Sequence, residues 1–321
     1  MLDFFLTICL YSSVLFFGAV VLTNVFASTP NPVPNDNDQY NEDEPRMRRL
    51  LSLPEAMAVV KNAPEIAFIT LTNNDYVHMT LNCLRSLKGI SGPQLKTYCI
   101  GTSAAKDVQL EGYPAIVLDT GALLSERQFF RKGLWGTLTQ KKICIIHMNL
   151  LVNDFVCITD GDVVFRREFW SYLIDNIGDS DLLIQNDTME DTCTDNVCSG
   201  FMFIRKNAKT LKLFDPENTM HRVHEIQFDD QVYMNEIKTE LDFKLLPLSL
   251  FPNGKYYQNI ICTANGNTSN TECTGHAGTD GTDGTDEETD NGSGGSEGPM
   301  MVHFNWTRDK VSAMKHCGLW I

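Results

Sequence analysis

The chain has 321 residues, of which 43% are hydrophobic, so it is long enough to bury the core of one large domain and to carry appendages. Its formal net charge is −15 at pH 7. We expect no nucleic-acid partner.

The N-terminal segment is apolar and long enough to cross a membrane. Phe4–Phe26 is 23 residues long and contains no charged residue, whereas the apolar part of a signal peptide has only roughly 7–15 residues. We therefore predict that residues 1–27 form a single-pass membrane anchor. Cleavage of a signal peptide after Ala27 is the alternative.

Two further segments are too polar to fold. Residues 28–63 are predicted to be a stem, because 28–49 are rich in Pro, Asn, Asp and Glu. Residues 275–298 repeat G-T-D, contain seven acidic residues and no Lys or Arg, and are predicted to be a disordered insertion. Without these seven and the five acidic residues of 36–44, the formal charge is only −3. The acidity therefore says little about the partner of the folded domain.

Residues 64–321 are predicted to form one α/β domain with a mixed sheet flanked by helices, because apolar strands alternate with helical stretches. Strands are predicted at Ile66–Thr72, Leu95–Ile100, Ala115–Leu118, in the run ending at Thr159, at Asp181–Gln185, Gly200–Ile204 and Met301–Trp306. Helices are predicted after a cap in Thr72–Asp75, within Arg127–Asn153, around 208–214 and 229–240, and at Asp309–His316.

The run F-V-C-I-T-D-G-D-V-V-F, Phe155–Phe165, is apolar apart from two carboxylates. Asp160 and Asp162 are two residues apart, so in an extended segment they point the same way, and Gly161 lets another group approach the backbone. At the carboxyl end of a strand, this pair suits Mn²⁺ or Mg²⁺ with positions left for phosphate oxygens. Two alternatives are a D-G turn between short strands and a haloacid-dehalogenase-like phosphatase with Asp160 as the nucleophile.

Several motifs occur in the order typical of the nucleotide-diphospho-sugar transferase family, which includes plant cell-wall xylosyltransferases. They are I-A-F-I-T-L-T-N-N, I-T-D-G-D-V-V-F, L-L-I-Q-N-D, C-S-G-F-M-F-I-R, D-D-Q-V-Y-M-N, H-F-N-W and K-x-x-x-M-K-x-x-G-L-W. The chain resembles this family over roughly residues 66–242 and the final twenty residues. The resemblance implies a Rossmann-type GT-A fold, a UDP- or GDP-sugar donor, a glycan or glycoprotein acceptor, and a retaining, Mn²⁺-dependent reaction. It also implies a type II membrane protein of the Golgi or another secretory lumen.

By this resemblance, Asp160 and Asp162 bind the metal that bridges the donor diphosphate, and His303 is a third ligand. Imidazole is an acceptable ligand for Mn²⁺. The alternative for His303 is a histidine buried in an aromatic strand. If H-F-N-W alternates as a strand, His303 and Asn305 lie on one face and Phe304 and Trp306 on the other.

The resemblance also assigns residues to the nucleotide and to the transferred sugar. The nucleotide-binding residues are Thr70, Thr72, Lys142, Gly161, Ser199, Gly200 and Lys310. The residues with catalytic roles around the sugar are Asp187, Asp230 and Gln231, whose carboxylates and amide can bond sugar hydroxyls and stabilise an oxocarbenium-like transition state. Five of them have a plainer alternative: the two threonines and Asp230 could cap helices, and the two lysines could be solvated. Cys198 departs from the family, in which Asn is common before Ser-Gly.

Cysteines and sequons suggest modifications. Cys193 with Cys198 and Cys262 with Cys273 are plausible disulfides, although a reduced core is equally compatible. The N-x-S/T sequons are at Asn186, Asn267, Asn291 and Asn305. If Asn305 faces the site, its sequon should remain unglycosylated.

A phosphatase and a non-catalytic, membrane-tethered sugar-binding protein are the alternatives to a glycosyltransferase.

Overall fold

The computed structural model describes residues 64–118, 132, 134–222, 229–262 and 298–321. The predicted anchor and stem lie outside these residues, as does the acidic segment up to Glu297. No helix in the described part of the chain is long and apolar enough to cross a membrane.

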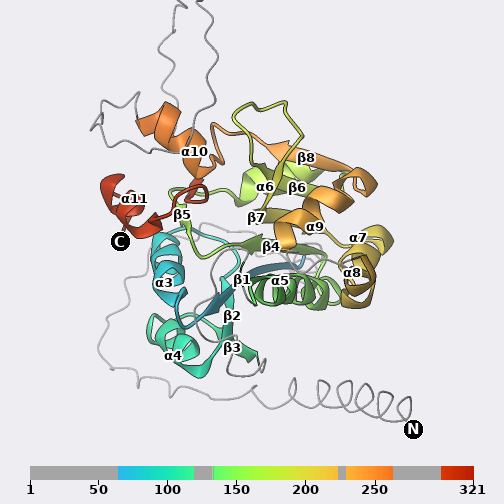
Figure 1. Ribbon diagram of the computed structural model, residues 1–321, viewed down its shortest axis with the longest axis horizontal. Helices are drawn as coiled ribbons and strands as arrows, with labels where there is room; N and C mark the ends of the chain where they lie inside the picture. The colour runs from blue at the N-terminus through green and yellow to red at the C-terminus, as the bar shows by residue number, and fades with distance from the viewer. Residues whose placement is uncertain (1–63, 119–131, 133, 223–228, 263–297) are drawn as a thin grey trace, which may run out of the picture. The chain divides into compact units, whose positions relative to one another are not determined.

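A seven-stranded mixed sheet forms the centre of the domain (Figure 1). Its strands are β1 (Ile66–Asn73), β2 (Lys96–Ile100), β3 (Ala115–Leu118), β4 (Phe155–Thr159), β6 (Leu182–Asn186), β7 (Val197–Arg205) and β8 (Phe243–Leu246). Their spatial order is β3-β2-β1-β4-β7-β6-β8, and only β7 runs antiparallel to its neighbours. Because β1 and β4 are parallel neighbours, their carboxyl ends meet at one edge of the sheet, which is where ligands bind in such sheets.

Helices cover both faces of this sheet, and each face has its own apolar core. One face packs against α3 (Val77–Ser86), α4 (Thr102–Leu110) and α6 (Trp170–Ile177). The other packs against α5 (Trp135–Leu150), α7 (Ala208–Leu213) and α9 (Asp230–Ile237), with α8 (Pro216–Arg222) beside them. Along β1, Phe68 enters the first core and Ile69 the second, which is the alternation expected of a strand buried on both faces.

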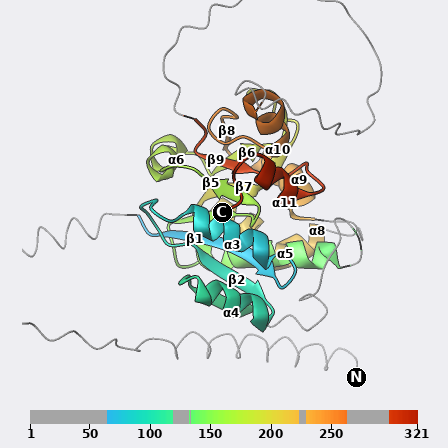
Figure 2. The same ribbon diagram turned by 90° about the vertical axis from the view of Figure 1, so that its left-hand side faces the viewer.

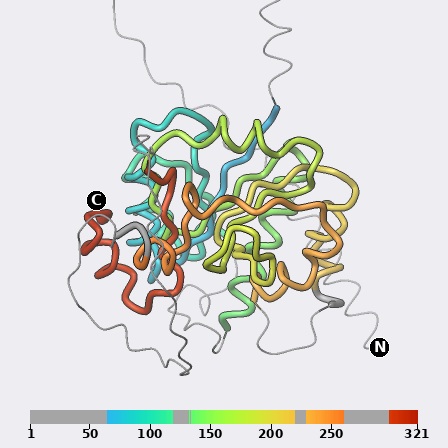
Figure 3. The backbone as a smooth tube through the Cα atoms, turned by 90° about the horizontal axis from the view of Figure 1, so that it is seen from above, coloured from blue at the N-terminus to red at the C-terminus, as the bar shows by residue number. Residues whose placement is uncertain are grey.

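A second, small sheet brings the C-terminal part of the chain to the edge of the first. It pairs β5 (Val163–Phe165) with β9 (Met301–His303) in antiparallel register, with Val163 opposite His303. The remaining elements are α10 (Gly254–Tyr256), a 3-10 turn (Lys238–Glu240), a π-helical turn (Tyr257–Cys262) and α11 (Lys310–His316). Figures 2 and 3 show the C-terminal segment beside α3.

The structure confirms the mixed α/β sheet and most predicted strands. It corrects two local predictions and excludes one alternative. α3 has no side-chain cap in Thr72–Asp75; instead Asn73 Oδ1 accepts the N–H of Tyr76. β4 and β5 belong to different sheets, so the D-G-D motif is not a hairpin turn between paired strands. The last strand ends at His303 rather than Trp306, whose φ of +64° is incompatible with a strand.

Candidate functional site

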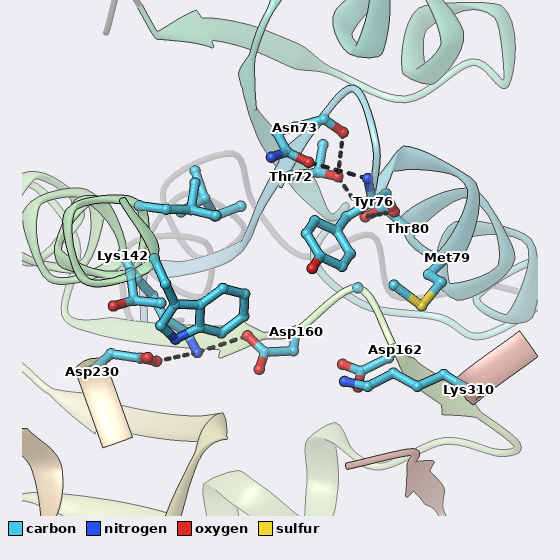
Figure 4. Close-up of a pocket in the computed structure, with 15 residues that line it drawn as sticks. Thr72, Asn73, Tyr76, Met79, Thr80, Lys142, Asp160, Asp162, Asp230 and Lys310 are labelled. Atoms are coloured by element: carbon cyan, nitrogen blue, oxygen red, sulfur yellow. Dashed lines mark hydrogen bonds and ion pairs between the residues drawn. The ribbon is translucent and has the colours of Figure 1, made fainter. Parts of the chain in front are cut away.

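The carboxyl ends of β1 and β4 form one wall of a pocket that contains both predicted aspartates (Figure 4). Asp160 follows β4 directly, and its N–H donates to the carbonyl of Gly200 on β7 at 2.7 Å. This bond fixes the backbone at the start of the motif. The carboxylate of Asp160 is 38% exposed, whereas that of Asp162 is almost fully buried.

Asp160, Asp162 and His303 form a cluster of possible metal ligands. One ligand atom from each residue lies within 4.8 Å of the other two. The His303 Nε2 atom is 3.2 Å from Asp162 Oδ1 and 3.9 Å from Asp160 Oδ2. The pairing of Val163 with His303 produces this proximity, because Asp162 immediately precedes Val163.

The orientation of the His303 ring is set from behind by Gln185. The Gln185 Nε2 group donates to the carbonyls of Phe251 and Pro252, so its Oε1 atom must face the imidazole, where it lies 2.7 Å from Nδ1. His303 therefore carries a proton on Nδ1 and presents Nε2 to the carboxylates. A metal-binding histidine is commonly held in this way by an acceptor on its other nitrogen.

The ionisable groups of the cluster are strongly coupled. Burial alone would lower the pKa of His303, but the carboxylate of Asp162 and the sulfur of Cys198 outweigh it and hold that pKa well above its ordinary value. Burial alone would raise the pKa of Asp162, yet Lys310 and His303 hold it far below its ordinary value. Asp162 is thus an anion that is compensated by cations.

Two lysines complete the charge balance. Lys142 on α5 is buried and lies 2.7 Å from Asp160 Oδ1 and 2.7 Å from Asp230 Oδ2. Although burial opposes its charge, the two carboxylates raise its pKa above the ordinary value. Asp230 Oδ2 also accepts the hydroxyl of Ser199 at 2.7 Å. Lys310, the first residue of α11, pairs with Asp162 (Figure 4).

The two predicted glycines are sites of close approach. A Cβ atom at Gly161 would lie 2.3 Å from the hydroxyl oxygen of Thr80. A Cβ atom at Gly200 would lie 2.1 Å from His303 Cε1 and 2.9 Å from Asp160 Oδ2. Gly200 therefore leaves the room in which the histidine and the first aspartate meet.

A second polar cluster surrounds Asp187, next to the charged one. Its Oδ2 atom accepts from Asn196 and from Gln231 Nε2, each at 2.8 Å. Its Oδ1 atom accepts from Asn305 Nδ2 and from the Trp306 indole, each at 2.7 Å. Asn305 and Trp306 thus reach the same carboxylate, which corrects the prediction that they point to opposite faces.

The pocket brings together most of the predicted residues but not all. The predicted residues that line it are Thr72, Lys142, Asp160, Gly161, Asp162, Asp230 and Lys310. Thr70 is fully buried and is not among the lining residues, whereas the Thr72 hydroxyl accepts from Thr80 at 2.9 Å. Four other predicted residues contact charged residues without lining the pocket. Ser199 bonds Asp230, and Gln231 bonds Asp187. His303 faces Asp162, and Gly200 lies against His303 and Asp160.

Sequence reasoning missed two aromatic residues in the pocket, Tyr76 and Trp135. Their rings are 6.4 Å apart in a T-shaped arrangement. Tyr76 precedes α3 and Trp135 begins α5, so each is placed by a helix start and neither belongs to a charged motif. Only the parallel pairing of their neighbouring strands could have indicated that they meet.

The disulfide between Cys193 and Cys198 is not present, and this alternative is corrected. Both cysteines are free, and Cys198 is buried with its sulfur 3.6 Å from His303 Nδ1. Burial raises the pKa of the Cys198 thiol. The pair Cys262 and Cys273 lies outside the residues whose side chains are described.

Comparison with known proteins gives the family. The sequence profile of the nucleotide-diphospho-sugar transferase family matches residues 103–315, which is more than half of the chain. The chain belongs to this family. The matched region contains the metal-ligand cluster and both lysines, so the geometry above is that of a nucleotide-diphospho-sugar transferase family member. The phosphatase alternative has no support from this assignment.

One curated relative and several solved structures are similar to this family member. UDP-galactose:fucoside alpha-3-galactosyltransferase of Dictyostelium discoideum is 23% identical over 257 residues, which cover 62% of this chain and 38% of the relative. The chain thus spans well under half the length of that relative. An active-site mutant of LgtC covers 79% of this chain and 94% of its own, with 9% identity and a TM-score of 0.48. The bifunctional glycosyltransferase WbbM covers 79% and 49%, with 10% identity and a TM-score of 0.47.

Proposed function

We propose that this chain is a GT-A glycosyltransferase that moves a sugar from a nucleotide-diphosphate sugar to a glycan or glycoprotein. The supporting observation is the cluster of Asp160, Asp162 and His303 between two lysines, inside the region that matches the family. A diphosphate donor requires both a hard cation and nearby ammonium groups to balance its charge. The pocket residues can supply ligands for the first and already include the second.

We infer that Asp160, Asp162 and His303 hold a divalent ion, Mn²⁺ or Mg²⁺. Two carboxylates and one imidazole nitrogen fit Mn²⁺, and Gln185 leaves the free nitrogen of His303 on the side of the carboxylates. When bound, such an ion neutralises charge on the diphosphate and so favours its departure. The two lysines lie 2.7 Å or less from the same carboxylates, and we propose that their ammonium groups bind phosphate oxygens of the donor.

Other side chains of the site are available to contact the nucleobase and the transferred sugar of the donor. Tyr76 and Trp135, which line the same pocket as the charged cluster, offer aromatic surface for the nucleobase. Lys142 and Ser199 fix the Asp230 carboxylate, and Asp187 fixes the amide of the neighbouring residue Gln231. We propose that Asp230 and Gln231 bind hydroxyls of the transferred sugar, that Asp187 orients Gln231, and that the reaction retains configuration.

The choice of first substrates follows the name of the curated relative. UDP-galactose is the first donor to test and a fucoside the first acceptor, because the relative is a UDP-galactose:fucoside galactosyltransferase.

We also propose that the N-terminal segment anchors the enzyme in a Golgi or other secretory membrane with the catalytic domain in the lumen. The apolar run Phe4–Phe26 supports the anchor.

The test is a screen of UDP- and GDP-sugars for hydrolysis and transfer by the full chain in detergent, with Mn²⁺ and with a chelator. We expect one donor to turn over, with loss of activity in chelator and in Asp160→Asn and Asp162→Asn, which keep size but remove charge. A sugar-binding protein without catalysis would bind the donor but release no nucleotide. Full activity in both Asn variants would overturn the metal assignment.

A further inference from the structure

Trp306 is presented to solvent in a backbone conformation that a large side chain avoids. Its φ is +64°, and among the described non-glycine residues it is the one with positive φ. It is also 60% exposed, although it lies only three residues after the last residue of the buried strand β9. Bulky residues in this conformation are rare outliers that cluster at functional sites. The fold therefore accepts strain to place an indole at the surface beside the pocket.

The indole is held in place by contacts on its edge and on its ring. Its Nε1 atom donates to Asp187 Oδ1 at 2.7 Å. The Nζ atom of Lys255 lies over the ring, 5.3 Å from the centroid. The supporting backbone is equally constrained, because Asn305 Oδ1 accepts the N–H of Gly254 at 2.8 Å and a Cβ at Gly254 would lie 2.4 Å from the Asn305 carbonyl oxygen.

The position of Trp306 relative to the other clusters indicates what it contacts. Asp187 bonds both Trp306 and Gln231, and Gln231 follows Asp230, which pairs with Lys142. The aromatic pair Tyr76 and Trp135 lines the pocket, whereas Trp306 is not among the lining residues and is linked to the proposed sugar-binding residues through its bond with Asp187. A rigid, exposed aromatic side chain with a polar edge provides a large contact area at low entropic cost.

We propose that Trp306 and Lys255 form the acceptor subsite, in which a pyranose ring of the acceptor glycan packs its apolar C–H face on the indole. The Lys255 ammonium donates to hydroxyls of the same sugar, and Asp187 keeps the indole in register with the sugar-transfer residues. This inference rests on the proposed function and adds the residues that recognise the acceptor.

The kinetic test uses two variants that both remove the indole N–H but differ in the aromatic face. With UDP-galactose and a panel of methyl glycosides of fucose, galactose, glucose and xylose, Trp306→Leu should raise the acceptor KM about tenfold, corresponding to a loss of about 1.4 kcal/mol. Trp306→Phe should stay within about threefold of wild type, and donor KM should be the same in the two variants. Equal acceptor KM in the Phe and Leu variants would overturn the inference.

A binding measurement separates this inference from the proposed function. Among the indole N–H resonances of the four tryptophans, the one missing in Trp306→Phe belongs to Trp306. Titration of the same methyl glycosides should shift this resonance in the full chain whether or not transfer occurs. Wild type without transfer to any glycoside would contradict the proposed function alone. Absence of any shift would overturn the subsite.

A stability measurement distinguishes the subsite from a structural anchor. Glycine adopts positive φ without strain, so Trp306→Gly should leave the melting temperature unchanged or raise it while acceptor KM rises. A clear fall in melting temperature would mean that Trp306 serves the fold and would overturn the inference.

Discussion

At the scale of single residues, the charges of Asp160, Asp162 and His303 are already paired with one another and with two lysines, so a metal ion bound there, as we propose, would have to displace some of these contacts. His303 has a raised pKa because the Asp162 carboxylate faces its Nε2 atom, which favours the protonated imidazole. If His303 binds a metal ion as we propose, its imidazole must be neutral, so binding would release a proton. Because His303 is only 2% exposed, the proton and the metal ion would compete for a buried nitrogen atom.

The first prediction is that Mn²⁺ affinity rises with pH, about tenfold per unit, until pH passes the raised pKa of His303, and then levels off. The sign follows because protons compete with metal below that pKa and not above it. Calorimetry in buffers of different ionisation enthalpy would measure both affinity and protons released. His303→Gln should bind more weakly and lose this rise. An affinity independent of pH in wild type would return His303 to the role of a buried core residue.

The second prediction concerns Lys310, which is one-third exposed and pairs with Asp162. If its ammonium moves to the diphosphate, Lys310→Ala should raise donor KM about tenfold, the usual scale for a charge-assisted hydrogen bond, with a smaller effect on kcat. Lys315→Ala is the matched control, because it removes an exposed charge from the same helix. Similar donor KM values in the two variants would show that Lys310 only balances Asp162.

At the scale of elements, the C-terminal segment that follows α11 is hydrogen-bonded to α3, mainly through the buried side-chain amide of Asn82. The Asn82 Nδ2 group donates to the carbonyl of Leu319 at 3.0 Å, and its Oδ1 atom accepts the N–H of Ile321. Arg85, one turn further along α3, donates to the Ile321 carbonyl at 3.2 Å. Met314 of α11 packs in a small core with Val164 of β5 and Val302 of β9. Docking of the C-terminal segment thus positions α11 over the metal-ligand cluster.

The third prediction is that Asn82→Leu destabilises the protein by about 1–3 kcal/mol, because two backbone groups lose their buried partner. Limited proteolysis should then cleave first within residues 310–321. The matched control is Asn176→Leu, in which an exposed helical asparagine is replaced. If Asn82→Leu unfolds no earlier than the control and keeps the C-terminal segment protected, the segment is held by its apolar contacts alone.

At the scale of the whole molecule, sequence patterns predicted the features that depend on residues close to one another in the chain. The pairing of Asp160 with Asp162 at a strand end is local, and the family resemblance added His303, which is 143 residues further on. Trp306 could not be placed, because the alternation of H-F-N-W is compatible with a longer strand and nothing in it indicates positive φ. The pocket pair of Tyr76 and Trp135 depends on two helix starts meeting across parallel strands, which no local pattern encodes.

The packing of the whole domain also decides which sequons are accessible. Asn186 is fully buried, with its Nδ2 atom donating to the Glu190 carbonyl at 2.7 Å. Asn305 donates its Nδ2 group to Asp187 at 2.7 Å. A glycan on either nitrogen is incompatible with these contacts of the folded domain, because N-glycosylated asparagines lie at the surface. Asn267 and Asn291 lie outside the described residues, Asn291 within the acidic segment 275–298 and Asn267 before it.

The last prediction is therefore that the full chain, produced in a secretory host, carries N-glycans at Asn267 and Asn291 but none at Asn186 or Asn305. Asn→Gln at the first two should each remove one glycan from the intact mass, whereas Asn186→Gln and Asn305→Gln should leave the glycan mass unchanged. A glycan at Asn305 would mean that its bond with Asp187 forms too late in folding to protect it, and would weaken the link between Asp187 and Trp306. A chain without any glycan would contradict the proposed luminal location, since two sequons in polar sequence would have met no glycosylation machinery.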